Sequence, residues 1–201
     1  MKNQLLVILF VFFTQVNFAQ TKPTSMPHNY EQAWKEVSDF ESKGLPESAL
    51  KAVNAIYEQA KKEQNASQLV KAVVHQLKFI DYKEENAFVK NLIKLREEAN
   101  AATFPTKPLL HSMLAEMYWQ YYQNNRYRFN ERSEVTNVKQ DDIETWSLNK
   151  IIEETFQQYQ LSLQQANKSK DTPIAMYEEV LHAGDAKGRS YRATLFDFLA
   201  H

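Results

Sequence analysis

Three glycines and six prolines in a chain of 201 residues are the strongest constraint on the fold. Proteins built from β-sheets need a turn about every 8–12 residues, and glycine and proline dominate such turns. This chain instead has long stretches rich in Glu, Lys, Gln, Ala and Leu, which are good helix formers. The sequence therefore predicts an all-α protein whose helices are joined by short loops.

The N-terminus has the pattern of a secretory signal peptide. Lys2 precedes an unbroken apolar run over residues 5–13, and Ala19 is a small residue at a suitable cleavage position. The run is much shorter than the ~20 apolar residues of a membrane-spanning helix. We therefore expect residues 1–19 to be removed and residues 20–29 to form a disordered lead-in. The mature chain would then lie in the periplasm, on the outer-membrane surface or outside the cell, without inserting into a bilayer.

The chain has no cysteine and almost no net charge. Cleavage after Ala19 removes one lysine and changes the formal net charge from −1 to −2. A nearly neutral protein is not expected to bind nucleic acid or an anionic membrane surface. Without cysteine there is no disulfide, no thiolate metal ligand and no cysteine nucleophile. The fold must therefore be held together by packing and polar contacts alone.

Apolar residues at helical spacing predict four helices in the first half of the mature chain. Asn29 is placed to cap the first helix and Gly44 to end it. Pro46 lies in the first turn of the second helix, where its missing N–H costs nothing. Asn65 or Ser67 starts the third. We expect these helices at residues 30–43, 46–64, 65–80 and 84–99.

Four further helices are expected after a break at residues 103–108. Asp141 or Asp142 is the candidate N-cap of the sixth helix, and Thr194 is that of the eighth. Residues 125–140 lack a helical pattern and are predicted to form a polar loop. We expect the helices at residues 109–124, 142–163, 171–183 and 194–201.

Helices joined by turns of a few residues must pack antiparallel, which predicts helical hairpins in a tetratricopeptide-like array. We expect one domain of about seven to eight helices over residues 30–201, although no second copy of a repeat of about 34 residues is convincing. The last helix is short, apolar and without a C-cap, so we expect the polypeptide to continue beyond His201. Its apolar patch comprises Leu195, Phe196, Phe198 and Leu199.

No pattern in the sequence predicts catalysis or a cofactor. Glu179 and His182 have the Glu-x-x-His spacing of di-iron bundles, but a second such pair is missing. The histidines do not have zinc-ligand spacing, and residues 184–189 lack the order of a phosphate-binding loop. Adjacent carboxylates such as Glu153 and Glu154 diverge around their helix. We therefore expect no enzyme activity, no catalytic residue, no metal and no cofactor.

Aromatic and basic side chains alternate near the end of the fifth helix, a feature of contact surfaces. Three interpretations remain open: the aromatic residues cap the core, contact another domain of the same chain, or bind a foreign ligand in a groove lined by tyrosines. The candidate interaction surface comprises Tyr118, Tyr121, Tyr122, Arg126, Tyr127, Arg128, Leu195, Phe196, Phe198 and Leu199.

Four stretches lie in order along the chain, at residues 33–51, 56–61, 122–127 and 191–201. Together they resemble the helical N-terminal region of large alpha-2-macroglobulin-like proteins of Bacteroidetes. The resemblance implies a structural or interaction module of a secreted protein, which docks on downstream domains of its own polypeptide or on an envelope protein. The implied parent protein is an endopeptidase inhibitor that traps proteases, often through a thioester that this cysteine-free chain cannot form. The alternative is a free-standing periplasmic domain that binds peptides or glycans.

Overall fold

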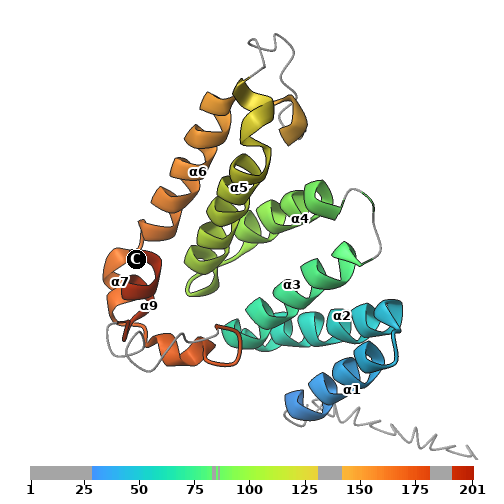
Figure 1. Ribbon diagram of the computed structural model, residues 1–201. Helices are drawn as coiled ribbons and strands as arrows, with labels where there is room; N and C mark the ends of the chain where they lie inside the picture. Colours follow the sequence, from blue (N-terminus) through green and yellow to red (C-terminus); the bar gives the residue numbers. More distant parts are fainter. Residues whose placement is uncertain (1–28, 83–84, 86, 131–141, 182–191) are drawn as a thin grey trace, which may run out of the picture.

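The computed structural model describes residues 29–82, 85, 87–130, 142–181 and 192–201, and every structural statement below refers to them. All of the regular elements in this part of the chain are helices, so the predicted all-α fold is confirmed (Figure 1). The elements are α1 (Tyr30–Ser42), α2 (Pro46–Glu63), α3 (Ala66–Asp81), α4 (Ala87–Ala101), α5 (Thr106–Asn130), η1 (Ile143–Thr145), α6 (Leu148–Leu163), α7 (Ala166–Lys170), η2 (Ile174–Tyr177) and α9 (Leu195–Leu199).

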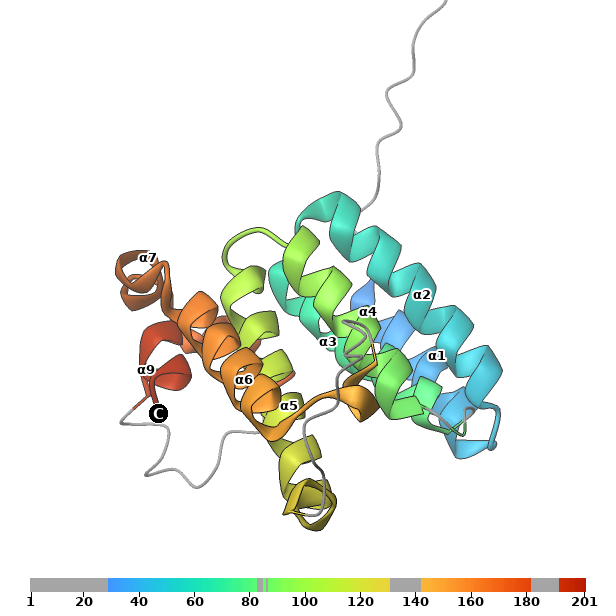
Figure 2. The ribbon, with the colours of Figure 1, turned by 90° about the horizontal axis from the view of Figure 1, so that it is seen from above.

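Helices that follow one another along the chain pack as neighbours. α1 packs on α2, α2 on α3, and α5 on both α4 and α6. Figure 2 shows α6 running beside α5, with α1 and α2 on the opposite side of the molecule from α7 and α9. Hairpins are thus present, but α5 has 25 residues and contacts α3, α4, α6 and α9. In a regular repeat array each unit contacts only its neighbours, so the tetratricopeptide-like arrangement remains a prediction.

The helix caps predicted at Asn29, Asn65 and Thr194 are present. The side-chain oxygens of Asn29 and Asn65 accept hydrogen bonds from the backbone N–H three residues on, at 3.1 and 3.2 Å. Thr194 and Asp197 form a reciprocal capping box at the start of α9. Gly44 follows α1 with a φ of +67°, which glycine adopts without strain. These bonds satisfy backbone groups that a helix end leaves unpaired.

The predicted fifth helix is too short at both ends. α5 begins at Thr106 because Pro108 is only its third residue, and N–H groups in a first turn have no partner within the helix. The helix continues to Asn130, so the predicted polar loop is wrong over residues 125–130. The remainder of that loop, residues 131–141, lies outside the described residues.

The start of the sixth helix also differs from the prediction. Asp142 caps only the 3-10 turn η1, and its side chain accepts a hydrogen bond from the N–H of Glu144. Ser147 is the N-cap of α6, since its hydroxyl oxygen accepts from the N–H of Lys150 at 3.2 Å. Trp146 therefore lies between the turn η1 and the N-cap of α6.

The predicted helix over residues 171–183 is replaced by the short 3-10 turn η2, preceded by α7, which was not predicted. The backbone N–H of Ile174 donates to the carbonyl of Ala193 at 3.0 Å, and the N–H of Leu195 donates to the carbonyl of Thr172 at 2.8 Å. The second bond uses the carbonyl of Thr172, which a helix beginning at Pro173 would need for its first internal hydrogen bond. Residues 182 and 183 lie outside the described residues.

Trp146 anchors the junction of α4, α5 and η1. Its buried ring packs against Tyr118 with 5.4 Å between ring centroids. The guanidinium of Arg96 lies 5.7 Å from the Trp146 ring and donates to the Tyr118 hydroxyl at 2.8 Å. The tyrosine hydroxyl and the arginine are therefore both satisfied inside the core.

The side of α6 that faces the core is mostly polar, contrary to the predicted apolar face. Its buried residues are Ile151, Thr155, Gln158 and Ser162. The hydroxyl groups of Thr155 and Ser162 donate to carbonyls of α6 itself. Gln158 lies 2.7 Å from Nδ1 of the buried His111 on α5. We call the packed contact between α5 and this side of α6 the α5–α6 seam.

Replacing Trp146 by Ala should lower the free energy of unfolding by about 3–5 kcal/mol, because it removes a buried indole and leaves a cavity. Trp119, which is 38% exposed, is the matched control, and Trp119→Ala should cost no more than about 1 kcal/mol. Urea denaturation of both variants measures the difference. Equal losses would show that the burial of Trp146 is wrongly described.

The burial of His111 predicts that stability falls in mild acid. Burial lowers the pKa of His111 below its ordinary value of 6.5, while the bond to Gln158 opposes this shift and Lys107 adds to it. Stability is therefore complete above pH 6.5 and declines below it, because the unfolded chain takes up a proton that the folded chain resists. Denaturation at pH 7.5 and 5.5 should show this loss, and His111→Asn should reduce it. An unchanged loss in His111→Asn would assign the effect to other groups.

Candidate functional site

The ten residues predicted to form an interaction surface fall into three groups by burial. Four are buried in the core: Tyr118, Tyr121, Leu195 and Leu199. Three are partly buried: Tyr122, Phe196 and Phe198. Three are exposed: Arg126, Tyr127 and Arg128. The predicted groove of three tyrosines is therefore wrong, because two of its members belong to the core.

The predicted apolar patch at the end of the chain is also wrong. α9 packs against α5, α6 and α7, where it buries Leu195 and Leu199. The ring of Phe196 lies 4.8 Å from Nζ of Lys170, which covers one of its faces. α9 is therefore a packed part of the fold.

Exposed aromatic and apolar side chains gather instead on the outer sides of α5 and α6. Tyr127 is 72% exposed, Phe156 63% and Ile152 46%. Large exposed apolar groups that adjoin one another mark interaction sites more often than scattered ones do. We call this set the α5–α6 surface; it comprises Trp119, Arg126, Tyr127, Ile152, Phe156 and Tyr159.

A hydrogen bond shows that the two halves of this surface adjoin. The hydroxyl of Tyr159 on α6 donates to Glu116 on α5 at 3.1 Å. Ile152 and Phe156 precede Tyr159 by seven and three residues, so they share its side of α6, and Trp119 shares the side of Glu116 in the same way. Burial and the Glu116 carboxylate raise the pKa of Tyr159, which keeps its hydroxyl protonated as the donor.

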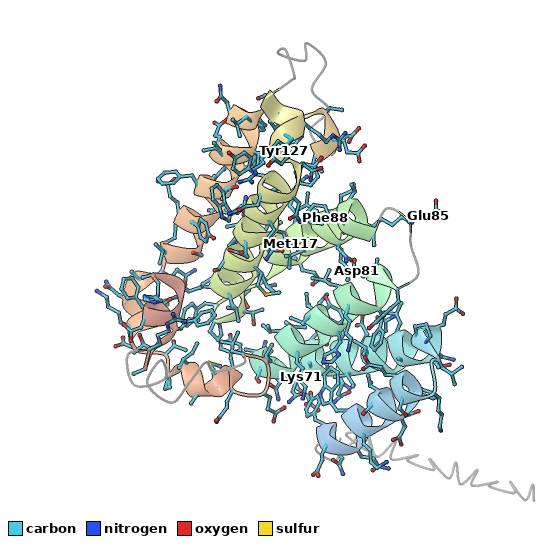
Figure 3. All side chains as sticks on the ribbon, viewed as in Figure 1. Lys71, Asp81, Glu85, Phe88, Met117 and Tyr127 are labelled. Atoms are coloured by element: carbon cyan, nitrogen blue, oxygen red, sulfur yellow. The ribbon has the colours of Figure 1, made fainter. Side chains whose placement is uncertain are left out.

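The composition of the α5–α6 surface is that of a protein–protein contact. The guanidinium of Arg126 lies 5.1 Å from the Tyr127 ring, and the Trp119 ring lies 5.2 Å from that of Tyr122. Trp, Tyr and Arg are the residue types enriched where binding energy concentrates in interfaces. Figure 3 labels Tyr127 on the distal part of α5. The surface therefore suits a partner that presents apolar side chains.

Sequence reasoning missed Trp119, Ile152 and Phe156 as surface residues. Ile152 and Phe156 occur at helical spacing with Ile151 and Tyr159, a pattern that by itself suggests a buried face. A signal was present in the spacing of Thr155, Gln158 and Ser162, which form a stripe of small or amide side chains on the side of the helix that also carries Ile151. Such a stripe allows close approach of a neighbouring helix.

The candidate metal ligands do not gather in the described part of the chain. In this part of the chain no three His, Asp or Glu side chains gather where they could hold a metal ion. Glu179 of the Glu-x-x-His pair is bonded to Lys71 instead, while His182 and residues 184–189 lie outside the described residues. Burial, with the ammonium groups of Lys78 and Lys71, lowers the pKa of His75.

Comparison with models of known families, with curated proteins and with solved structures gives no match to this chain. Among the described helices, none combines the length and the apolar character needed to cross a bilayer. A function therefore has to be argued from the sequence motifs and from the chemistry of the α5–α6 surface.

The exposure of Ile152 and Phe156 predicts that the double variant Ile152→Gln/Phe156→Gln keeps the stability of the wild type within about 1 kcal/mol, since surface substitutions rarely cost more. Thermal and urea unfolding measure this. Ile151→Gln, one residue away but buried, is the matched control and should cost several-fold more. A large loss in the double variant would place these side chains in the core.

Proposed function

We propose that this chain is a non-catalytic helical interaction module at the N-terminus of an exported alpha-2-macroglobulin-like protein, whose parent would be an endopeptidase inhibitor. Export is supported by the signal-peptide pattern of residues 1–19. The parent family is supported by the ordered sequence motifs. The interaction role is supported by the α5–α6 surface.

The observation that carries the proposal is the exposure of Ile152 and Phe156 on α6 and of Trp119 on α5. They stand on two long helices fixed to each other by the α5–α6 seam, so a partner would meet a preorganised surface. Glu116, the carboxylate within this surface, already accepts hydrogen bonds from Tyr159 and Gln120. Docking there would bury apolar area without leaving that charge unpaired.

The alternative is a free-standing domain that binds peptides or glycans. One feature favours it: neutral amide side chains are exposed on the same two helices. These are Gln120, Gln123, Asn124, Gln157 and Gln160, all of them exposed. Amides both donate and accept hydrogen bonds, as the recognition of sugar hydroxyl groups or of a peptide backbone requires.

Docking on downstream domains predicts a measurable complex. The segment encoded after His201, expressed separately, should bind this chain, and Ile152→Gln/Phe156→Gln should weaken the binding at least about 10-fold because two apolar contacts are lost. Isothermal titration calorimetry measures both affinities. Leu45→Gln is the matched control, since Leu45 is a comparably exposed apolar residue before α2 and should leave binding unchanged.

Two results would contradict the docking function: equal binding by the double variant and the wild type, or a downstream reading frame that stops at once. In the second case the free-standing domain takes precedence. Titration with peptide and glycan libraries would then identify its ligand, and the same double variant would test whether the α5–α6 surface binds it.

A further inference from the structure

Side chains from α1, α3 and the segment after α7 converge at one point of the molecule. We call residues 172–181 the strap; it runs from α7 to the beginning of α3 (Figure 1). Glu179 of the strap accepts hydrogen bonds through the same oxygen, Oε2, from Gln68 and Lys71 of α3, both at 3.1 Å. Trp34 of α1 contacts both of these donor side chains.

The amide of Gln68 is oriented by Trp34. An indole N–H can only donate, so the atom of Gln68 that faces Trp34 Nε1 at 2.6 Å must be the amide oxygen. The amide NH2 group then has to point the other way, toward the strap. Gln68 is buried, so this orientation is fixed by the fold. The orientation of this amide donor toward the Glu179 carboxylate is therefore fixed by residues of α1 and α3.

The ammonium group of Lys71 is positioned in a similar way. It lies 4.6 Å from the Trp34 ring, a favourable cation–π distance, and its side chain is only 20% exposed. The Trp34 ring in turn packs against His75, with 4.7 Å between centroids. Figure 3 labels Lys71 at the end of α3 nearest the strap. Both donors are thus held by contacts that do not involve Glu179.

The carboxylate of Glu179 is by contrast accessible. Its side chain is 60% exposed, and its bonds to Lys71 and Gln68 lower its pKa, so it is ionised at neutral pH. Exposed ion pairs contribute little net stability because water competes for both partners. Because the two donors are fixed and the Glu179 carboxylate is open to solvent, another carboxylate can take its place.

We propose that Trp34, Gln68 and Lys71 form a carboxylate-binding site, which Glu179 occupies within the chain and which an acidic side chain of a partner peptide can occupy in its place. The strap would then act as an internal competitor that limits access to this site. The proposal concerns a different part of the molecule from the α5–α6 surface and does not depend on the function proposed for that surface.

The test uses a fluorescent peptide with the sequence of residues 174–181, Ile-Ala-Met-Tyr-Glu-Glu-Val-Leu, and fluorescence anisotropy. The peptide should bind the Glu179→Gln protein at least about 10-fold more tightly than the wild type, because the internal carboxylate no longer competes. The same peptide carrying Gln at the position of Glu179 should bind about 10-fold more weakly to the Glu179→Gln protein. The other glutamate, that of Glu178, is retained, so the two peptides differ at one group.

Variants of the protein identify the site. In the Glu179→Gln background, Lys71→Met and Gln68→Leu should each weaken binding about 10-fold, while Lys90→Met, a lysine of α4, should have no effect. Circular dichroism checks that each variant is folded, and having two site variants guards against the failure of one. Equal binding of the two peptides, or binding unaffected by both site variants, would overturn the proposal. So would the absence of binding at millimolar peptide.

Hydrogen exchange gives a second readout that needs no peptide. In the Glu179→Gln protein, backbone amides of the strap should exchange at least about 3-fold faster than in the wild type, because opening of the strap costs less. Glu153→Gln, an exposed glutamate on α6, is the control and should leave strap exchange unchanged. Identical strap protection in the Glu179→Gln protein and the wild type would show that Glu179 does not hold the strap.

Discussion

The close packing of α6 on α5 is the constraint on which the rest of the structure depends. Thr155 and Ser162 let the helices approach because they are small, and their hydroxyl groups bond to carbonyls of their own helix. Gln158 reaches across to His111, which pairs two buried polar groups. Once this side of α6 faces α5, Ile152 and Phe156 must point to solvent. The α5–α6 surface is therefore a direct consequence of the seam.

The aromatic residues of α5 show how one helix supplies both core and surface. Tyr118 is buried because Arg96 donates a hydrogen bond to its hydroxyl and the ring of Trp146 packs against its ring. Tyr127, nine residues further on, points outward beside Arg126. The interleaving of aromatic and basic residues was a correct sign of a surface at the distal end of the helix. It was misleading for Tyr118, because the partners that bury this residue come from α4 and η1.

Long-range polar contacts replace the covalent links that a chain without cysteine cannot form. Glu179 meets Gln68 across a sequence separation of 111 residues, and it ties the strap to the first helices of the fold. The other end of the strap is held by antiparallel pairing with the residues at the start of α9. A tie of this kind is weak compared with a disulfide, and this weakness would allow the carboxylate to be exchanged.

The sequence by itself determined the all-α fold class. It also determined the caps at Asn29, Asn65 and Thr194, because each cap is a contact within three residues that no other part of the chain has to supply. Only the tertiary structure decided which side of α6 is buried, where α5 ends and what α9 covers. A helical pattern shows which residues share a face, but whether that face meets a neighbour or water depends on helices far away in the sequence.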